Sequence, residues 1–136
     1  MHIIDTWQKN ASQLIAVAAG RDHAELVVQN CRLVNVNSRE ILDGWEVAII
    51  KGRFAYVGPS ASHCVGPNTS VFDAEGKFII PGLCDGHMHV ESGMLTPAEF
   101  AAAVIPHGTT TMFTDPHEIA NVLGLSGVKM MHDEAM

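Results

Sequence analysis

The sequence predicts a mixed α/β fold in which a small β-rich segment precedes a segment of alternating strands and helices. Two observations support this prediction. Residues 24–77 contain short β-rich runs separated by turn dipeptides, whereas residues 78–136 alternate between apolar or β-branched runs and helical patterns. The expected domains are a helical segment over 1–23, a β-segment over 24–77 and the beginning of a strand–helix domain over 78–136.

The first segment has the spacing of a short helix. Residues 3–19 carry apolar side chains such as Trp7 and Leu14 at mixed helical spacings. Gly20 follows at the position where helices often end in a left-handed conformation. The pattern predicts an N-terminal helix that ends just before Gly20.

The β-rich segment contains four short apolar runs, at residues 26–28, 33–36, 47–50 and 54–57. Dipeptides with turn chemistry separate them, namely Ser38-Arg39, Asp43-Gly44, Lys51-Gly52 and Gly58-Pro59. Such dipeptides join antiparallel strands, because they adopt the tight turns of hairpins at little steric cost. A small antiparallel meander is therefore expected.

The last segment begins with a nearly all-apolar run, residues 78–84. Runs of this kind are typical of a strand buried on both faces in a parallel sheet. Residues 109–114 are rich in threonine, a β-branched residue, and predict the second parallel strand. Ser126 is expected to cap a last helix that starts at Val128.

A helix between these two strands has a strong start signal. Thr96 provides a hydroxyl at the N-cap, Pro97 occupies the first helical position, and Glu99 provides the carboxylate of a capping box. The helix is expected to end near Pro106, with Gly108 taking the left-handed exit.

The composition excludes several classes of function. Of the 136 residues, 47% are hydrophobic and 17% are charged, which is typical of a folded chain and not of a disordered one. The 15 acidic and 8 basic residues give a net charge of −7 without a basic cluster. No nucleic-acid partner is expected, because such binding depends on cationic side chains. A small uncharged or cationic ligand fits this charge better.

The cysteines and the hydropathy indicate a location. Cys31, Cys64 and Cys84 are an odd number at wide spacing, unlike the dense patterns of disulfide-rich secreted domains. Reduced thiols in the cytoplasm are therefore expected. No segment reaches the roughly 20 apolar residues that span a bilayer, so no membrane partner is expected.

The candidate metal ligands follow the first apolar run. Side chains two apart on a strand point the same way, so Asp85, His87, His89 and Glu91 are expected to project from one face. Two imidazoles in that position are suitable ligands for a divalent metal ion. The alternative is a pair of idle histidines on an exposed strand tip. The preceding apolar strand and the carboxylates in phase favour the metal site.

A second polar cluster, Asp115 to Glu118, follows the second predicted strand. Functional groups of parallel α/β folds gather at the carboxyl ends of strands, so the two clusters are expected to meet. Asp115 is the main candidate of this cluster, ahead of His117 and Glu118. An Asp-Pro pair also begins turns, and Asp115 as a simple cap of the next helix is an equally good interpretation.

Several of these strings resemble a known family. Residues 81–89, PGLCDGHMH, resemble the first barrel strand of the amidohydrolase superfamily, and the β-rich segment resembles the small β-sandwich of those enzymes. Residues 89–100, 106–111 and 115–124 resemble the adenine deaminase branch, with the strings HVESGMLTPAEF, PHGTTT and DPHEIANVLG. These strings are more specific than His-x-His, which dihydroorotases, hydantoinases and sugar deacetylases share.

The resemblance implies a (β/α)8 barrel with a β-sandwich. Because such a barrel needs about 250 residues, this chain would supply the N-terminal portion, with a sandwich segment and the first two strand–helix units. The implied reaction is hydrolytic deamination of adenine to hypoxanthine and ammonia. A hydroxide generated on a pair of divalent metal ions, Mn²⁺ or Fe²⁺, would attack the purine.

The resemblance also implies roles for individual residues. His87 and His89 match the first pair of metal ligands of the family. Asp115 lies where a carboxylate would contact the purine ring, and Glu91 is close enough to join the site as a second catalytic carboxylate. The other ligands of the family have no counterpart in this chain. A missing C-terminal portion or a second copy of the chain is therefore the expected partner, besides adenine.

Two other functions remain open at this point. The first is an amidohydrolase that acts on another cyclic amide, of the dihydroorotase or hydantoinase type. The second is a truncated, catalytically inactive remnant that persists as a β-rich module. The remnant would bind no stoichiometric metal. An adenine deaminase and an amidohydrolase of cyclic amides would both use His87 and His89.

Overall fold

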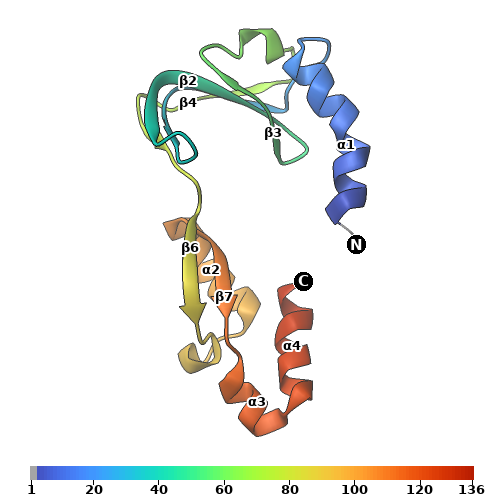
Figure 1. The fold of residues 1–136 in the computed structure, drawn as a ribbon, viewed down its shortest axis with the longest axis vertical. Helices are drawn as coiled ribbons and strands as arrows, with labels where there is room; N and C mark the ends of the chain where they lie inside the picture. Colours follow the sequence, from blue (N-terminus) through green and yellow to red (C-terminus); the bar gives the residue numbers. More distant parts are fainter. Residues whose placement is uncertain (1–2) are drawn as a thin grey trace. The chain divides into compact units, whose positions relative to one another are not determined.

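The computed structural model describes the backbone from Ile3 to Met136 and the side chains from Asn10 onward. The chain divides into two compact units, one that ends at Pro81 and one that spans Gly82–Met136 (Figure 1). No helix in the described part of the chain has the length and hydropathy needed to cross a membrane. Both units combine helices with a sheet, so the predicted mixed α/β class is confirmed.

The first unit begins with helix α1 (Ile3–Ala18). Gly20 has a φ of 67°, and its N–H donates to the carbonyl oxygen of Val17 at 3.0 Å. The predicted N-terminal helix and its glycine exit are therefore confirmed.

A five-stranded sheet follows α1 in the first unit. Its strands are β1 (Leu26–Asn35), β2 (Glu40–Ile50), β3 (Arg53–Gly58), β4 (Ser70–Asp73) and β5 (Phe78–Ile79). β1, β2 and β3 form the predicted antiparallel meander. β4 and β5, in contrast, pair in parallel with β1. Residues 59–69 return the chain to the start of β1, where Ser70 pairs with Leu26, so β4 enters the sheet in parallel.

Two β-bulges explain where the predicted strand boundaries are wrong. The runs at 26–28 and 33–36 belong to the single strand β1, whose register shifts near Asn30, a residue with a φ of 53°. The expected turn at Asp43-Gly44 lies inside β2, where Cys31 pairs with Trp45 and Arg32 with Asp43. Gly44 is the extra residue, and its φ of 69° is a conformation that glycine adopts without steric cost.

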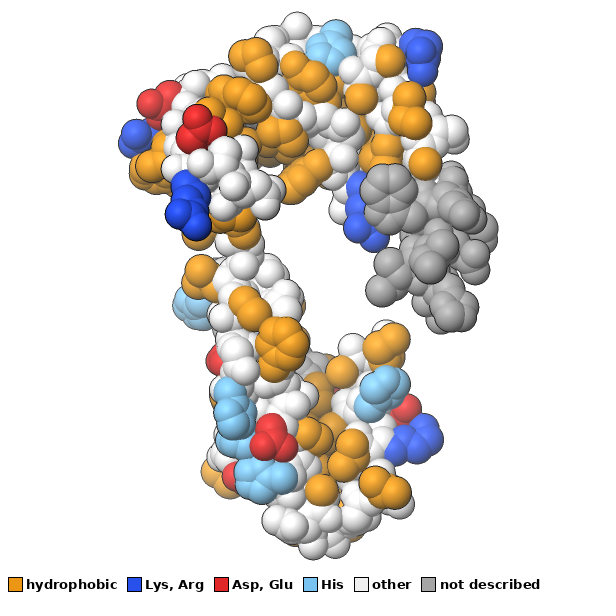
Figure 2. All heavy atoms as spheres, in the orientation of Figure 1, with side chains coloured by type: hydrophobic (Ala, Val, Ile, Leu, Met, Phe, Trp, Pro, Cys, Tyr) orange, Lys and Arg blue, Asp and Glu red, His pale blue; other side chains and the backbone are white. Residues whose placement is uncertain are grey.

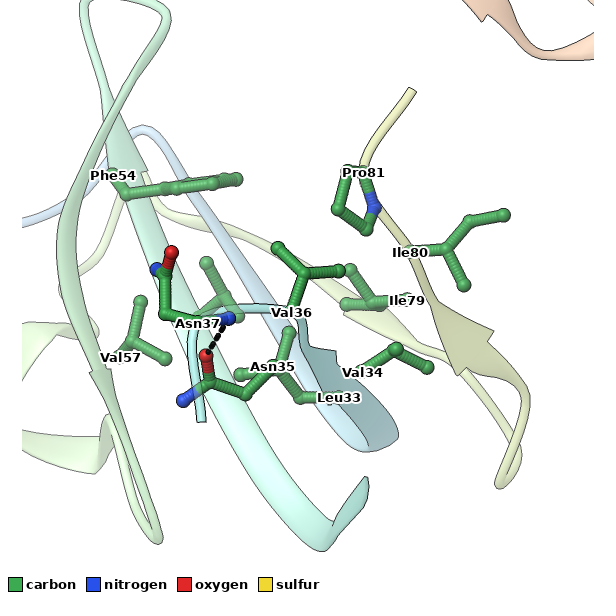
Figure 3. A pocket seen from close by; sticks show the side chains of 11 residues that line it. Leu33, Val34, Asn35, Val36, Asn37, Phe54, Val57, Ile79, Ile80 and Pro81 are labelled. Atoms are coloured by element: carbon green, nitrogen blue, oxygen red, sulfur yellow. Dashed lines mark hydrogen bonds between the residues drawn. The ribbon is translucent and has the colours of Figure 1, made fainter. Parts of the chain in front are cut away.

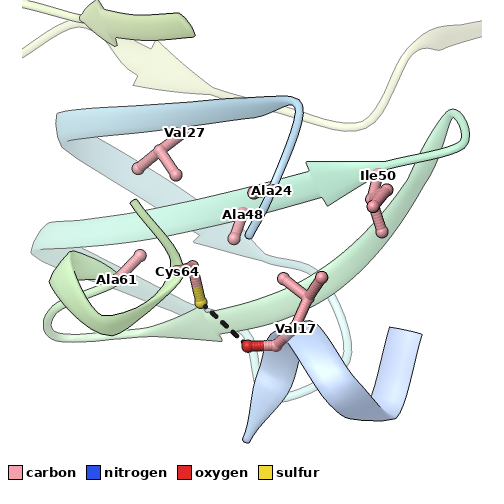
Figure 4. Packing of buried hydrophobic residues seen from close by; sticks show 7 residues of the cluster. All are labelled: Val17, Ala24, Val27, Ala48, Ile50, Ala61 and Cys64. Carbon is pink, nitrogen blue, oxygen red and sulfur yellow. Dashed lines mark hydrogen bonds between the residues drawn. The ribbon is translucent and has the colours of Figure 1, made fainter. Parts of the chain in front are cut away.

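The core of the first unit lies between α1, the sheet and a short 3₁₀ helix, η1 (Ser62–Cys64). Small and β-branched side chains fill it, namely Val17, Ala24, Val27, Ala48, Ile50, Ala61 and Cys64 (Figure 4). The Cys64 thiol donates a hydrogen bond to the carbonyl oxygen of Val17 at 3.3 Å. This contact ties η1 to the last turn of α1.

The three thiols are expected to react differently. Cys31 and Cys64 are fully buried and Cys84 is exposed. Burial raises the pKa of both the Cys31 and the Cys64 thiol, because the thiolate is poorly solvated there. Iodoacetamide at pH 8 should therefore modify Cys84 and spare the other two until denaturant is added, as peptide mass spectrometry would show. Rapid labelling of Cys64 in the folded chain would contradict this.

The same pKa shifts predict how stability depends on pH. Unfolded thiols ionise near their ordinary pKa of about 8.5, whereas the folded Cys31 and Cys64 thiols stay protonated to higher pH. The unfolded state therefore loses protons first, and the free energy of unfolding should fall as the pH rises above about 8.5. Denaturant titrations at pH 7.5 and pH 10 would measure this fall, and a Cys31→Ala, Cys64→Ala variant should show less of it.

The predicted apolar strand over residues 78–84 is wrong, because the run is divided. Phe78 and Ile79 form β5 and pair with β1 in the first unit, and Leu83 begins the next strand in the second unit. Pro81 lacks the N–H that a continuous ladder needs, which breaks the run. Phe78 and Leu83 are half exposed, at 52% and 51%, and are not buried on both faces.

The second unit contains one β–α–β element followed by two helices. Strands β6 (Leu83–Met88) and β7 (Thr109–Thr114) are parallel neighbours, and helix α2 (Pro97–Val104) connects them. The Thr96 side chain accepts a hydrogen bond from the Glu99 N–H, and Gly108 has a φ of 99°. The predicted helix start and exit are therefore confirmed, with a 3₁₀ turn, η3 (Ile105–His107), before the exit.

Helices α3 (His117–Leu123) and α4 (Leu125–Ala135) complete the second unit. The predicted helix start at Ser126 and Val128 is wrong, because α4 already begins at Leu125. Gly124, with a φ of 61°, turns the chain directly after α3, and the new helix follows without a side-chain cap.

Gly127→Ala is expected to weaken the packing of α3 against α4. Gly127 is buried, and an added Cβ would lie 2.8 Å from the carbonyl oxygen of Ile119 and 3.1 Å from the Cβ of Leu123. Alanine gains about 1 kcal/mol in helix propensity, but overpacking costs about 1–3 kcal/mol. A net loss of about 1 kcal/mol in the opening free energy of both helices should appear in amide hydrogen exchange. The exposed neighbour Ser126→Ala is the control, and equal effects of both variants would refute the packing argument.

Candidate metal site

The candidate site lies where β6 and β7 end side by side. The two strands are parallel and pair Met88 with Thr114, so the residues that follow them start from adjacent points. The Asp115 N–H donates to the carbonyl oxygen of Met88 at 2.9 Å, which continues the pairing one step beyond the strands. The two polar clusters of the sequence therefore meet, as expected from the parallel arrangement.

Three side chains with metal-binding atoms gather at this point. One potential ligand atom each from His87, His89 and Asp115 lies within 4.8 Å of the others. His87 Nε2 is 3.7 Å from Asp115 Oδ2, and the His87 and His89 rings are 4.7 Å apart between centroids. In the second unit, histidine side chains are visible on the surface beside acidic ones (Figure 2). Two imidazoles and a carboxylate suit a divalent transition metal, and three protein ligands leave a position for water or substrate.

His89 is held in an orientation that suits a ligand. Its Nδ1 lies 2.8 Å from the backbone carbonyl oxygen of Asp115. A carbonyl oxygen only accepts hydrogen bonds, so Nδ1 carries the proton and the lone pair of the neutral ring is on Nε2. Histidines that bind metals commonly donate their other N–H to a carbonyl or carboxylate, which fixes both tautomer and ring orientation.

His117, which the sequence ranks behind Asp115, lies beside the three-residue group in the structure. Its Nδ1 lies 3.4 Å from Asp115 Oδ2, and its ring packs edge-on against His89 at 4.5 Å. Asp115 Oδ2 therefore lies close to two imidazole nitrogens, one from His87 and one from His117. The available signal was the position of His117 two residues after Asp115, at the start of the helix that follows β7.

Asp85 and Glu91 are not part of the three-residue group. The expected alternation from Asp85 to Glu91 is wrong, because β6 ends at Met88 and its register with β7 shifts between Asp85 and Met88. Asp85 Oδ1 accepts a hydrogen bond from the backbone N–H of His87 at 3.1 Å. Glu91 lies in a 3₁₀ turn, η2 (Glu91–Gly93), and its Oε1 accepts hydrogen bonds from the backbone of α3.

The ligand group is open to solvent. The side chains of His87 and Asp115 are 64% and 54% exposed, and His89 is partly buried. An ion from solution can therefore reach His87 and Asp115 directly, and His89 is held beside them by its contact with the Asp115 carbonyl oxygen.

The first unit has a pocket of a different character. It has a volume of about 350 Å³ and is lined by apolar side chains such as Val36, Phe54 and Ile80 (Figure 3). Its polar lining comes from Asn35 and Asn37, which are joined by a hydrogen bond of 3.1 Å. None of the described residues that line it is titratable, so it offers no acid, base or strong metal ligand.

Comparison with known sequences relates the second unit to a known protein family. Residues 78–136 match the family model described as Amidohydrolase family. Over 131 residues, the chain is 66% identical to an adenine deaminase of Ruegeria pomeroyi, a match that covers 96% of this chain and 22% of the relative. It is 52% identical to an adenine deaminase of Clostridium botulinum, over 89% of this chain and 20% of that protein. The chain thus spans 22% or less of the length of these two relatives.

Solved structures agree with this result at the level of the fold. A putative prolidase from Bifidobacterium longum superposes with a TM-score of 0.56 at 26% identity. The match covers 65% of this chain and 23% of the prolidase chain. A structure described as molinate hydrolase gives a TM-score of 0.54 at 25% identity. The match covers 78% of this chain and 28% of the hydrolase chain. Residues 78–136 are thus similar in sequence to the amidohydrolase family, and the solved structures agree with this similarity at the level of the fold.

Proposed function

We propose that this chain carries part of the active site of an adenine deaminase, which hydrolyses adenine to hypoxanthine and ammonia. The observation that carries the proposal is the group of His87, His89 and Asp115 at the adjoining ends of two parallel strands. This group lies within the residues that match the amidohydrolase family. The substrate follows from relatives named adenine deaminase that are 52% to 66% identical to the chain.

His87 and His89 would hold a divalent metal ion, with Asp115 as the carboxylate of the same site. The fixed Nδ1–H of His89 and the mixed nitrogen and oxygen donors fit such an ion. When bound, a divalent ion lowers the pKa of water and so supplies the nucleophile for hydrolysis near neutral pH. A binuclear Mn²⁺ or Fe²⁺ centre needs further ligands, which would come from polypeptide outside this chain or from a second copy.

The two carboxylates take different parts in this proposal. Asp115 is exposed and lies beside two imidazoles, so it is free to bind the ion and to face a substrate. We therefore give Asp115 the catalytic role. Glu91 has one oxygen engaged by two backbone N–H groups and the other buried, which favours a positioning role over a catalytic one.

The finer architecture is part of the same proposal. The five-stranded sheet would be one layer of a small β-sandwich, and residues 82–136 would be the first two strand–helix units of a (β/α)8 barrel. The parallel pair β6 and β7 with its connecting helix supports the barrel. Large apolar side chains are exposed in both units, such as Phe54 at 68% and Leu125 at 86%, and a larger domain would cover such surfaces.

A chimera would test the function. The chain would replace the homologous stretch of the Ruegeria pomeroyi adenine deaminase, and hypoxanthine would be measured by chromatography with Mn²⁺ present. Adenine turnover that is lost in the matched His87→Ala, His89→Ala chimera is the expected result. A folded chimera that hydrolyses a hydantoin or a dihydropyrimidine and leaves adenine intact would overturn the substrate. A folded chimera without any turnover would favour an inactive remnant.

A further inference from the structure

We infer that Glu91 is a positioning residue whose carboxylate braces the loop after β6 against the start of α3. The inference depends on the proposed function in one respect: the contacts of Glu91 are taken to hold His89, Asp115 and His117 together as a metal site. The contacts of Glu91 themselves are independent of any metal ion.

The two loops at the end of the β6–β7 pair are joined by a row of hydrogen bonds. All of them connect residues 88–92 with residues 115–119. They are Asp115 N–H to Met88 O at 2.9 Å, His89 Nδ1–H to Asp115 O at 2.8 Å, Ser92 Oγ–H to Glu118 Oε1, and Glu118 N–H and Ile119 N–H to Glu91 Oε1. The site residues therefore lie on two segments that are fixed to each other at several points.

Glu91 makes two of these contacts with a single oxygen. Its Oε1 accepts from the backbone N–H of Glu118 at 3.2 Å and of Ile119 at 3.4 Å. These N–H groups have no partner within α3, because the helix has only just begun. Removal of the carboxylate would leave both groups without their acceptor and release the first turn of α3 from the loop after β6.

The second oxygen of Glu91 argues against acid–base chemistry. Glu91 Oε2 is buried and has no hydrogen-bond partner among the described residues. An acid or base must reach the proton that it transfers, directly or through one water. With Oε1 engaged by the backbone and Oε2 buried, neither oxygen is placed to touch a substrate.

The position of the brace connects it to the metal site. Glu91 follows His89 by two residues, and His117 directly precedes the braced Glu118. His89 already contacts the Asp115 carbonyl oxygen, and His117 lies 3.4 Å from the Asp115 carboxylate. Movement at the start of α3 would therefore displace His117 and Asp115 relative to His89.

Three substitutions of Glu91 separate positioning from chemistry. Glu91→Gln keeps an oxygen that accepts the two N–H groups but cannot act as an acid or base. Glu91→Asp keeps the carboxylate but is one methylene shorter, so it cannot reach both groups. Glu91→Ala removes the acceptor. The exposed Glu99 on α2, changed to alanine, is the matched control for loss of one negative charge in the same unit.

The first readout is amide hydrogen exchange of Glu118 and Ile119 in the metal-free chain, followed by NMR. The wild-type chain and Glu91→Gln should protect both amides, whereas Glu91→Asp and Glu91→Ala should lose protection by about 10-fold or more. Unchanged protection in Glu91→Ala, or equal loss in Glu91→Gln and Glu91→Ala, would overturn the inference.

The second readout is Mn²⁺ affinity, measured by electron paramagnetic resonance of free Mn²⁺. Loss of groups that orient metal ligands typically weakens binding by about 10–100-fold, so Glu91→Asp and Glu91→Ala should fall in this range and Glu91→Gln should stay near wild type. If wild type binds no Mn²⁺, the proposed function fails, and the exchange data still decide whether Glu91 braces the loops. In the chimera, a Glu91→Gln variant with normal Mn²⁺ affinity but abolished kcat would overturn the positioning role.

Discussion

Replacing His87 and His89 together by alanine is expected to abolish stoichiometric Mn²⁺ binding by the chain. Loss of partners that merely orient a ligand costs about 10–100-fold in affinity, so loss of two of three ligands should exceed 100-fold. Each single variant should be intermediate, with His89→Ala also losing the contact to the Asp115 carbonyl oxygen. Competition with a chelator of known affinity would measure the effect.

The control for this experiment uses two other histidines of the same unit. His107 at the end of η3 and His132 on α4 are exposed and lie outside the ligand group. A His107→Ala, His132→Ala variant removes the same number of imidazoles and should bind Mn²⁺ as the wild-type chain does. Equal losses in the two double variants would mean that the imidazoles bind the ion without a defined site.

Local chemistry explains the parts of the fold that the sequence predicts well. Thr96 and Glu99 form their capping contact within one turn, and Gly20 and Gly108 end helices through their own backbone conformation. The parallel entry of β4 depends instead on a long connection, and no short-range pattern contains that information. The bulge at Gly44 has the composition of a hairpin turn, so only the pairing partner distinguishes the two.

In the candidate site, too, some features can be predicted from the sequence and others depend on details of the strand pairing. His87, His89 and Asp115 come together because parallel strands align their carboxyl ends, a rule that can be applied to a sequence. The place of Asp85 and Glu91 depends on where β6 ends and where its register shifts, which period-two alternation does not predict. The contacts across the two loops, of Glu91 with the start of α3 and of His117 with His89, become visible only in the structure.

Asp115→Asn is expected to weaken Mn²⁺ binding by about 10–100-fold. The variant isolates the carboxylate, because the contacts of Asp115 with Met88 and His89 use its backbone N–H and carbonyl oxygen, which the substitution leaves in place. An amide oxygen is a weaker ligand than a carboxylate, and its NH₂ group would face the imidazoles of His87 and His117. Titration of the chain with Mn²⁺ under electron paramagnetic resonance would measure the change.

The matched control is Asp85→Asn, which removes one negative charge from the interior of the neighbouring strand β6. Its amide oxygen can still accept from the His87 N–H, so this variant should bind Mn²⁺ with nearly unchanged affinity. If Asp115 contacts only the purine, Asp115→Asn would leave Mn²⁺ binding intact and weaken adenine binding in the chimera.

A double-mutant cycle then tests whether Asp115 and His87 share one ion. Independent sites give additive losses, whereas ligands of a common ion give non-additive ones. Because His87 Nε2 and Asp115 Oδ2 are only 3.7 Å apart, we expect the combined variant to lose less affinity than the sum of the two single losses.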